Sequence, residues 1–149
     1  MSVFIRPART TDAGKIGDIL WRFQHQHDWM PVLYSGVETI AFCGQMIDRG
    51  WVTVAERERM ILGFLARDGD DVCSLYVDAA QKRQGVGREL LDHAKSQNKR
   101  LTLRAFEANV GAQKFYSRQG FVERNRCAGT NAENLPEIHF EWKRKDARS

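Results

Sequence analysis

The residues with the clearest chemical potential form the run Lys-Arg-Gln-Gly-Val-Gly-Arg at positions 82–88, between an apolar strand-like segment and an amphipathic helix. A strand that breaks at glycines and then begins a helix leaves several backbone N–H groups unpaired at the positive end of the helix dipole, where they can bind phosphate. Gly85 and Gly87 lack a Cβ, so a diphosphate can come close to the backbone. Three cations accompany them: Lys82, Arg83 and Arg88. The run predicts a site for a diphosphate-bearing cofactor, although an ordinary glycine-rich turn has the same spacing.

Two well-known phosphate loops do not fit this run. A dinucleotide fingerprint requires a third glycine where Leu90 stands, and a P-loop requires Gly-Lys followed by Ser or Thr, which the sequence does not contain. The sequence therefore favours neither a nicotinamide dinucleotide nor a nucleoside triphosphate as the ligand.

Length and composition predict one globular domain over residues 1–149, with 42% hydrophobic and 28% charged residues. No segment approaches the roughly 18 consecutive apolar residues of a membrane span, and the N-terminus has no apolar signal core. We therefore expect a cytoplasmic protein without a membrane partner. The net charge of +4 is spread among acidic residues, which argues against a nucleic-acid partner.

The three cysteines are widely separated and flanked by apolar residues, so we expect buried free thiols and no metal site. They are Cys43, Cys73 and Cys127. His25 and His27 with Asp28 superficially suggest a metal site, but further ligands are missing.

Hydrophobic periodicity predicts the elements of the first half of the chain. A strand at 3–6 precedes a helix that Asp12 caps and that ends near His25, with Ile16, Ile19, Leu20 and Phe23 inward. A loop at 26–35 leads to a second helix that ends at Gly50. Its expected inner stripe is Val37, Ile40, Ala41, Gly44 and Ile47.

The second half is predicted to alternate strands and helices. Strands at 51–56, 61–67 and 72–77 form antiparallel hairpins, and the helix after the glycine loop turns Val86, Leu90, Leu91 and Ala94 inward. A strand at 101–106 follows, and this order of strand, crossover helix and strand predicts that it lies parallel to the strand at 72–77. A short helix at 112–119 and a hairpin of strands at 121–128 and 137–144 complete the chain.

Two motifs that follow one another along the chain resemble those of the GNAT superfamily of N-acetyltransferases. The first is Leu75-Tyr76-Val77 followed by Gln-Lys-Arg-Gln-Gly-Val-Gly-Arg-Glu-Leu-Leu at 81–91, which is similar to the acetyl-CoA motif of that family. The second is Asn-Val-Gly-Ala-Gln-Lys-Phe-Tyr-Ser-Arg-Gln-Gly-Phe at 109–121, which is similar to the family's pattern of asparagine, alanine, aromatic-tyrosine and Gly-Phe. Lys82 stands where the family usually has Arg or Gln. Because backbone N–H groups hold the diphosphate, we expect this departure to change affinity only modestly.

The resemblance implies an α/β fold of the GNAT type: a central, mostly antiparallel sheet of about seven strands with a splayed parallel pair, flanked by about four helices. It implies acetyl-CoA as co-substrate, with the pantetheine arm between the splayed strands and no metal. The cofactor-binding residues that it implies are Leu75, Tyr76, Val77, Lys82, Arg83, Gln84, Gly85, Val86, Gly87, Arg88, Asn109 and Tyr116. For Asn109, a role as a turn or helix N-terminal asparagine is an equally good interpretation as a cofactor contact.

Transfer of acetyl from a thioester to an amine needs a neutral nucleophile, a stabilised oxyanion and a proton for the departing thiolate. Tyr116 is the expected general acid, because a phenol with a pKa near 10 donates without being ionised at neutral pH. The alternative is that Phe115 and Tyr116 are core aromatics. A backbone N–H near Val77 is the expected oxyanion donor. The base is left open among water and four side chains, for each of which a solvated turn or surface charge is the favoured interpretation: Glu56, Asp71, Glu107 and His27.

The resemblance therefore implies an N-acetyltransferase that moves acetyl directly to a primary amine of a small molecule or peptide. The alternative is a non-catalytic acyl-CoA-binding or sensing module with the same cofactor site. The expected acceptor pocket lies between the loop at 26–35, with Trp29 and Tyr34, and the segment at 129–136. The sequence leaves open both the acceptor and whether the chain forms a homodimer.

Overall fold

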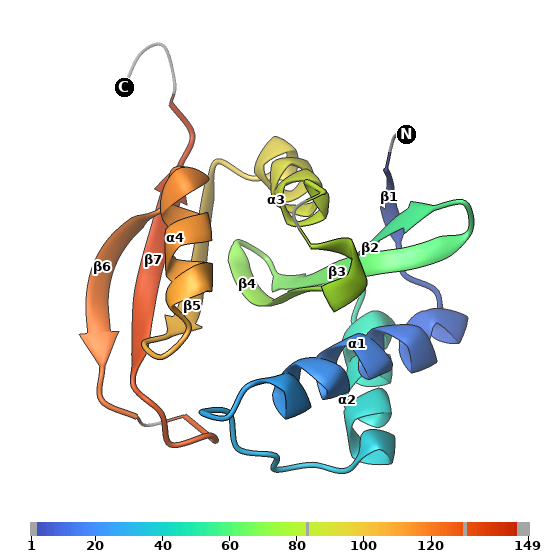
Figure 1. The fold of residues 1–149 in the computed structure, drawn as a ribbon. Helices are drawn as coiled ribbons and strands as arrows, with labels where there is room; N and C mark the ends of the chain where they lie inside the picture. The colour runs from blue at the N-terminus through green and yellow to red at the C-terminus, as the bar shows by residue number, and fades with distance from the viewer. Residues whose placement is uncertain (1–2, 83, 130, 146–149) are drawn as a thin grey trace.

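A seven-stranded sheet organises the part of the chain that the computed structural model describes, residues 3–82, 84–129 and 131–145 (Figure 1). The strands are β1 (Phe4–Pro7), β2 (Val52–Arg57), β3 (Met60–Asp68), β4 (Asp71–Val77), β5 (Arg100–Phe106), β6 (Val122–Cys127) and β7 (Glu137–Lys143). The helices are α1 (Ala13–Gln26), α2 (Gly36–Asp48), α3 (Val86–Gln97) and α4 (Val110–Arg118), with short 3-10 turns η1 (Thr10–Asp12) and η2 (Ala79–Gln81). The predicted mixed α/β fold is confirmed.

The sheet has the order β1-β2-β3-β4-β5-β7-β6, and β4 and β5 form its parallel pair. Two-residue turns join β2 to β3 and β3 to β4, with left-handed φ values of 52° at Glu58, 66° at Arg59 and 63° at Gly69. β4 and β5 pair only at Asp71 with Thr102 and at Val72 with Leu103. Beyond these residues the two strands diverge, as the predicted splayed pair requires.

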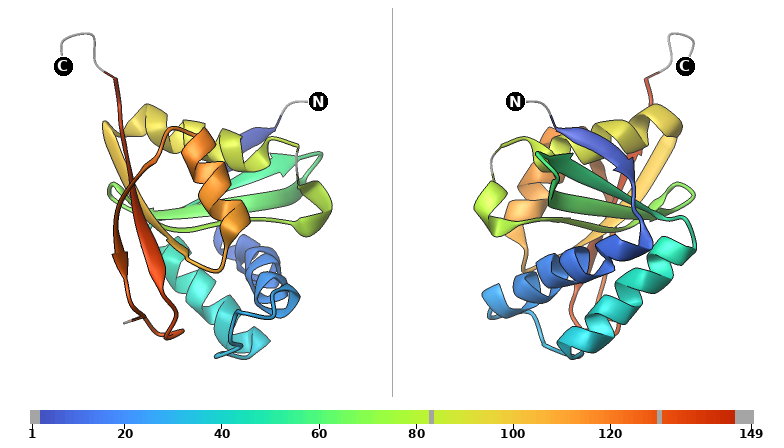
Figure 2. Two further views of the ribbon diagram at one scale, coloured as in Figure 1. Left: turned by 60° about the vertical axis from the view of Figure 1, so that its left-hand side comes forward. Right: turned by 90° about the vertical axis from the view of Figure 1, so that its right-hand side faces the viewer.

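Two apolar clusters hold the helices against opposite faces of the sheet (Figure 2). The first joins α3 and α4 to β4, β5 and β7, and it includes the four predicted inward residues of α3: Val86, Leu90, Leu91 and Ala94. The second joins α1 and α2 to β2 and β3 around Phe64. Phe23 lies outside both buried sets and is half-buried at the end of α1. In the described residues no helix combines the length and the apolar character needed to cross a membrane.

The predicted inner stripe of α2 is wrong in most of its positions. The buried residues of the helix are Thr39, Cys43, Met46 and Ile47, whereas Val37 is 79% exposed and Ile40 is 40% exposed. The helix packs against α1 as well as the sheet, and a Cβ added to Gly17 of α1 would lie 2.7 Å from Ile40. When a helix packs against two neighbours, the apolar residue types alone do not show which of its residues are buried. A polar residue such as Thr39 can belong to the buried stripe.

Asp12 precedes α1 as predicted, but its carboxylate does not cap that helix. It pairs with Arg6 at 2.8 Å and accepts a hydrogen bond from the backbone N–H of Arg9 at 2.7 Å. The hydrogen bond from the Arg6 guanidinium lowers the pKa of this carboxyl group. The side chain therefore ties β1 to the start of α1.

The prediction of buried thiols holds only for Cys43, since Cys73 is exposed and Cys127 is half-buried. Cys73 is the extra residue of a bulge in β4, between the pair of Arg67 with Val72 and the pair of Ala66 with Ser74. A bulge interrupts the strand's alternation of side chains, which the sequence pattern did not reveal. All three thiols are free.

Candidate active site

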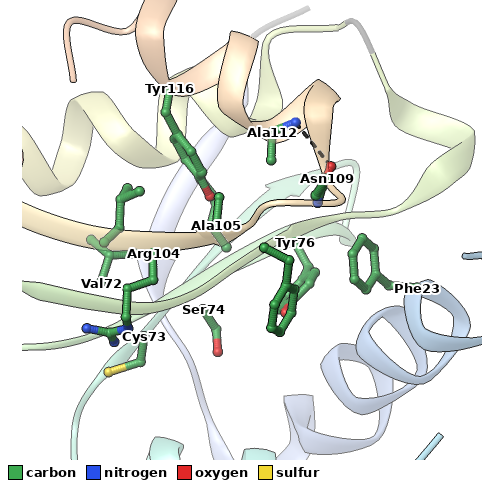
Figure 3. Close-up of a pocket in the computed structure, with 13 residues that line it drawn as sticks. Phe23, Val72, Cys73, Ser74, Tyr76, Arg104, Ala105, Asn109, Ala112 and Tyr116 are labelled. Atoms are coloured by element: carbon green, nitrogen blue, oxygen red, sulfur yellow. Dashed lines mark hydrogen bonds between the residues drawn. The ribbon is translucent and has the colours of Figure 1, made fainter. Parts of the chain in front are cut away.

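The divergence of β4 and β5 opens a pocket of about 100 Å³ between the two strands (Figure 3). Residues 72–76 of β4 and 103–106 of β5 form its walls, and Phe23, Asn109, Ala112 and Tyr116 close it. Because β5 pairs with β4 only at Asp71 and Val72, the facing backbone edge of β4 beyond them has no strand partner. Such an edge can hydrogen-bond the amides of an extended ligand as a further strand would.

Asp71, one of the four predicted base candidates, lies where β4 and β5 are still paired. Its carboxylate accepts two hydrogen bonds from Arg104, at 3.1 and 3.0 Å, and one from the Thr102 hydroxyl at 2.9 Å. These contacts join β4 to β5 where their pairing ends. The geometry therefore gives Asp71 a structural role and argues against a free base there.

Glu56 is likewise engaged, because its carboxylate accepts a hydrogen bond from Arg6 at 2.8 Å. Glu107 lies 3.6 Å from Arg126, with half of its side chain exposed. Neither of these two residues lines the pocket between β4 and β5.

Tyr116 extends from α4 into the pocket, with 8% of the residue exposed (Figure 3). Its ring packs against Phe121 at 5.8 Å and Phe140 at 6.0 Å between centroids. Burial raises the pKa of this phenol above its ordinary value. The hydroxyl group therefore stays protonated at neutral pH and is available as a hydrogen-bond donor. The predicted packing in the core is confirmed, and the residue also lines the pocket, where its role as general acid stays a prediction.

Asn109 caps α4, because its side-chain oxygen accepts a hydrogen bond from the backbone N–H of Ala112 at 3.1 Å. The same residue lines the pocket. The interpretation of Asn109 as a helix N-terminal asparagine is thus confirmed. Its predicted contact with the cofactor stays a prediction.

The glycine loop leads from the end of β4 into α3, as predicted. Gly85 is the N-terminal cap of α3, with a left-handed φ of 80°, and Lys82, Gln84 and Arg88 are exposed beside it. The predicted cation Arg83 lies outside the described residues. Val86 is 1% exposed, so its side chain belongs to the core and only its backbone can serve a ligand.

Gly87 has a packing role that the sequence did not indicate. A Cβ at this position would lie 3.1 Å from Cζ of Phe115 and 3.7 Å from Cγ2 of Val77. The absence of a side chain therefore lets α4 approach the beginning of α3, in addition to leaving the backbone open.

Arg57 supports the glycine loop, and no sequence motif points to it. Its Nη2 donates to the side-chain oxygens of Gln81 at 2.8 Å and Gln84 at 3.0 Å. These bonds connect the end of β2 to the segment before α3, which lies more than twenty residues away along the chain. Only the folded sheet brings the three side chains together.

We expect Arg57→Ala to weaken acetyl-CoA binding by about 3- to 10-fold, because each lost hydrogen bond contributes about 1 kcal/mol and the loop becomes less ordered. Titration calorimetry of the cofactor measures this effect. Arg67→Ala is the control, since Arg67 bonds Gly69 and Gln97 instead. Equal losses in both variants would show a general electrostatic effect and contradict the positioning role.

Aromatic rings form the side of the pocket that faces the loop after α1. The centroid of Trp29 lies 5.6 Å from that of Phe106, and Phe23 lies 4.9 Å from Tyr76. The His27 ring packs against that of Phe23 in a tilted arrangement, with 4.3 Å between centroids, and its Nδ1 lies 2.9 Å from the backbone oxygen of Phe23. Of the four base candidates, His27 is the one that contacts this aromatic wall. No group of ligands that could hold a metal ion occurs among the residues that the structure describes.

The site combines an open strand edge, a pocket and a glycine-capped helix N-terminus, an arrangement that suits an extended, phosphate-bearing ligand. Residues 48–123 match the acetyltransferase (GNAT) domain, a segment that contains both motifs and the whole β4–α3–β5–α4 unit. The chain belongs to the GNAT family of acetyltransferases.

Several relatives share this segment or the fold. The peptidyl-lysine N-acetyltransferase YjaB of Escherichia coli is 38% identical over 71 residues, 48% of each chain. The solution structure of its apo form matches at a TM-score of 0.80 and 26% identity, over 95% of this chain and 98% of that one. The 5-NmdU N-acetyltransferase of Pseudomonas phage PaMx11 is 32% identical over 55% of this chain and 64% of its own. The matched part spans about half the length of YjaB in the sequence comparison.

A further structure shows the same fold with a cofactor. The structure of yncA from Salmonella typhimurium, solved with its cofactor acetyl-CoA, matches at a TM-score of 0.72 and 19% identity over 99% of both chains. At this level of identity the likeness shows the fold alone.

Proposed function

We propose that this protein transfers an acetyl group from acetyl-CoA to a primary amine of a small molecule or peptide, without a covalent acetyl-enzyme. The observation that carries the proposal is the continuity of the site: the unpaired edge of β4 runs from the pocket to the glycine loop at the start of α3. A diphosphate at that helix start and a pantetheine arm along β4 would bring the thioester into the pocket beside Tyr116.

In the proposed reaction the amine nitrogen attacks the thioester carbonyl carbon, and the C–S bond then breaks. Tyr116 donates its proton to the departing thiolate, and a backbone N–H near Val77 stabilises the oxyanion. The amine loses its proton to water or to His27, the base candidate on the aromatic wall. The acceptor enters between the loop after α1 and the β6–β7 loop. The free thiols suit the reducing cytosol in which we propose that the enzyme acts.

Two measurements test the proposal. Acetyl-CoA is expected to raise the unfolding midpoint of the protein, and thiol release is expected to rise when an amine acceptor is added. A panel of polyamines, amino acids, aminoglycosides and lysine peptides covers the acceptor classes. The names of YjaB and of the phage relative, a peptidyl-lysine and a 5-NmdU N-acetyltransferase, support including peptides and modified nucleosides. Stabilisation without thiol release from any acceptor would favour the non-catalytic acyl-CoA module.

We expect Trp29→Ala to raise the KM of the acceptor by about 10-fold while leaving that of acetyl-CoA unchanged, because the lost ring covers the acceptor side of the pocket next to Phe106. Steady-state kinetics with each substrate varied in turn measures the two constants. Tyr34→Ala is the matched control, since Tyr34 belongs to the same loop but is 49% exposed. If both KM values rise together, or if the melting temperature alone falls, Trp29 maintains the fold and does not contact the acceptor.

A further inference from the structure

Five aromatic rings form a continuous series between the diverging strands β4 and β5. The ring centroids of Phe106 on β5 and Trp29 in the loop after α1 lie 5.6 Å apart, and Trp29 lies 5.3 Å from His27. His27 lies 4.3 Å from Phe23 of α1, which in turn lies 4.9 Å from Tyr76 of β4. These five residues, the aromatic cluster, therefore bridge the two strands that enclose the pocket.

The aromatic cluster lies on the opposite face of the sheet from Tyr116. Tyr76 packs against the apolar residues that α1 and α2 cover, whereas Tyr116 belongs to the core that α3 and α4 cover. Figure 3 shows Phe23 and Tyr76 beside α1, with Tyr116 on the far side of the strands. Because the proposed cofactor site begins at the start of α3, an acceptor that meets the thioester from the other face passes along the aromatic rings.

The rings of the aromatic cluster are partly open to solvent. All five residues are half-buried, and Phe23, Tyr76 and Phe106 line the pocket. By contrast, Phe64 in the core beside Tyr76 is 0% exposed. A contiguous apolar surface that stays partly open next to a pocket is typical of a ligand-binding site. The aromatic cluster therefore offers an apolar wall to a ligand in addition to stabilising the fold.

The pocket beside this wall has little charge with which to bind a cation. No acidic residue occurs among the described residues that line it, and burial raises the pKa of the Tyr76 phenol to about 12, so that this ring is uncharged at neutral pH. The arginine of the pocket, Arg104, already donates two hydrogen bonds to Asp71. The attacking nitrogen must be neutral, and an apolar wall favours the neutral form by lowering the pKa of the amine. A second ammonium group would lose water there without gaining a partner.

We propose that the aromatic cluster binds the apolar arm of the acceptor, and that the acceptor carries one amine at the end of an uncharged alkyl or arylalkyl chain. This inference rests on the proposed function and names its substrate class. The side chain of a lysine in an otherwise uncharged peptide belongs to this class. Polyamines and aminoglycosides do not, because they bring further ammonium groups to a pocket whose described lining residues include no carboxylate.

Chain length tests the apolar contact without turnover. NMR titration of the CoA-bound protein with 1-aminopropane, 1-aminobutane and 1-aminopentane is expected to show an affinity that rises about fourfold with each methylene. Trp29→Ala is expected to reduce this gain to less than about twofold, and Trp29→Phe should retain most of it because a ring remains next to Phe106. Absence of binding, an affinity that does not rise with chain length, or a gain that Trp29→Ala leaves intact overturns the proposal.

Charge tests the exclusion of a second ammonium group. The chains of 1-aminopentane and 1,4-diaminobutane have the same length, and the monoamine is expected to bind at least about tenfold more tightly to the wild type. Trp29→Glu is expected to bring this ratio to about one or below, since the new carboxylate can pair with the second ammonium group. Phe42→Glu is the matched control and should leave the ratio unchanged, because Phe42 lies on α2, is 50% exposed and is outside the pocket. Equal affinity of the two amines in the wild type, or an equal change of the ratio in both variants, refutes the selection.

Thiol release separates this inference from the proposed function. With acetyl-CoA in place of CoA, the order of kcat/KM among the amines is expected to follow the order of their affinities. Binding that rises with chain length, without thiol release from any amine, would support the aromatic cluster as an apolar-amine site and refute the transferase. Thiol release that is as fast with the diamine as with the monoamine would support the transferase and overturn the selection. Each variant should keep the wild-type shift in melting temperature with acetyl-CoA, which reports an intact fold and cofactor site.

Discussion

Tyr116→Phe is expected to lower the turnover number by roughly 10²- to 10⁴-fold while leaving acetyl-CoA affinity nearly unchanged, because the substitution removes the proton donor and keeps the ring. The packing against Phe121 and Phe140 survives, since both contacts are made by the aromatic ring. Burial raises the pKa of Tyr116, so the wild-type phenol is protonated throughout the neutral range. The loss is therefore expected at every pH at which the enzyme is assayed near neutrality.

Single-turnover thiol release at saturating acetyl-CoA and acceptor measures the chemical step, and titration calorimetry measures cofactor affinity. Tyr34→Phe is the matched control, because it removes a phenol that is 49% exposed and lies outside the pocket. An unchanged rate in Tyr116→Phe would remove this residue from the mechanism. A loss of cofactor binding or of thermal stability would instead assign Tyr116 to packing.

The parts of the fold that the sequence predicts well depend on local regularities. The inward face of α3 repeats every three to four residues and packs on one partner, the sheet, so periodicity suffices to identify it. The parallel pairing of β4 with β5 follows from the crossover through α3. The faces of α2 and the bulge at Cys73 depend on neighbours that are distant along the chain, and local patterns do not encode them.

The same distinction applies to the site. Gly85, Asn109 and Tyr116 occur in short motifs, and the structure places them at the helix start and around the pocket. Arg57 belongs to no motif, and it bonds two glutamine side chains that only the folded sheet brings to it. Asp71 looked like a free carboxylate in the sequence because its partner Arg104 is thirty-three residues away. Sequence motifs therefore locate the predicted cofactor site better than they locate the residues that support it from elsewhere in the fold.

Gly85→Glu is expected to abolish most of the stabilisation by acetyl-CoA, through steric exclusion of the diphosphate and through repulsion by the new carboxylate. A Cβ at Gly85 would meet no protein atom within 4 Å, so a side chain there would occupy the space left for the ligand rather than disturb packing. At a concentration of about 100 Kd, acetyl-CoA should stabilise the wild type by about 2.7 kcal/mol, or roughly 5 to 11 °C in melting temperature. A 100-fold weaker affinity would reduce this to about 0.4 kcal/mol, or roughly 1 °C.

The main complication is backbone strain, because Gly85 has a φ of 80° and any larger residue there costs about 1 to 2 kcal/mol in the ligand-free protein. Gly69→Glu is the matched control: this glycine has a φ of 63°, equally open surroundings and a place in the β3–β4 turn, at the other end of β4 from the glycine loop. Both variants should melt at lower temperatures than the wild type without ligand, by similar amounts. Only Gly85→Glu should lose the shift on addition of acetyl-CoA, since strain alone lowers both melting temperatures and leaves their difference intact. A full shift in Gly85→Glu would mean that the diphosphate binds elsewhere, and a lost shift in Gly69→Glu would mean that the assay reports strain.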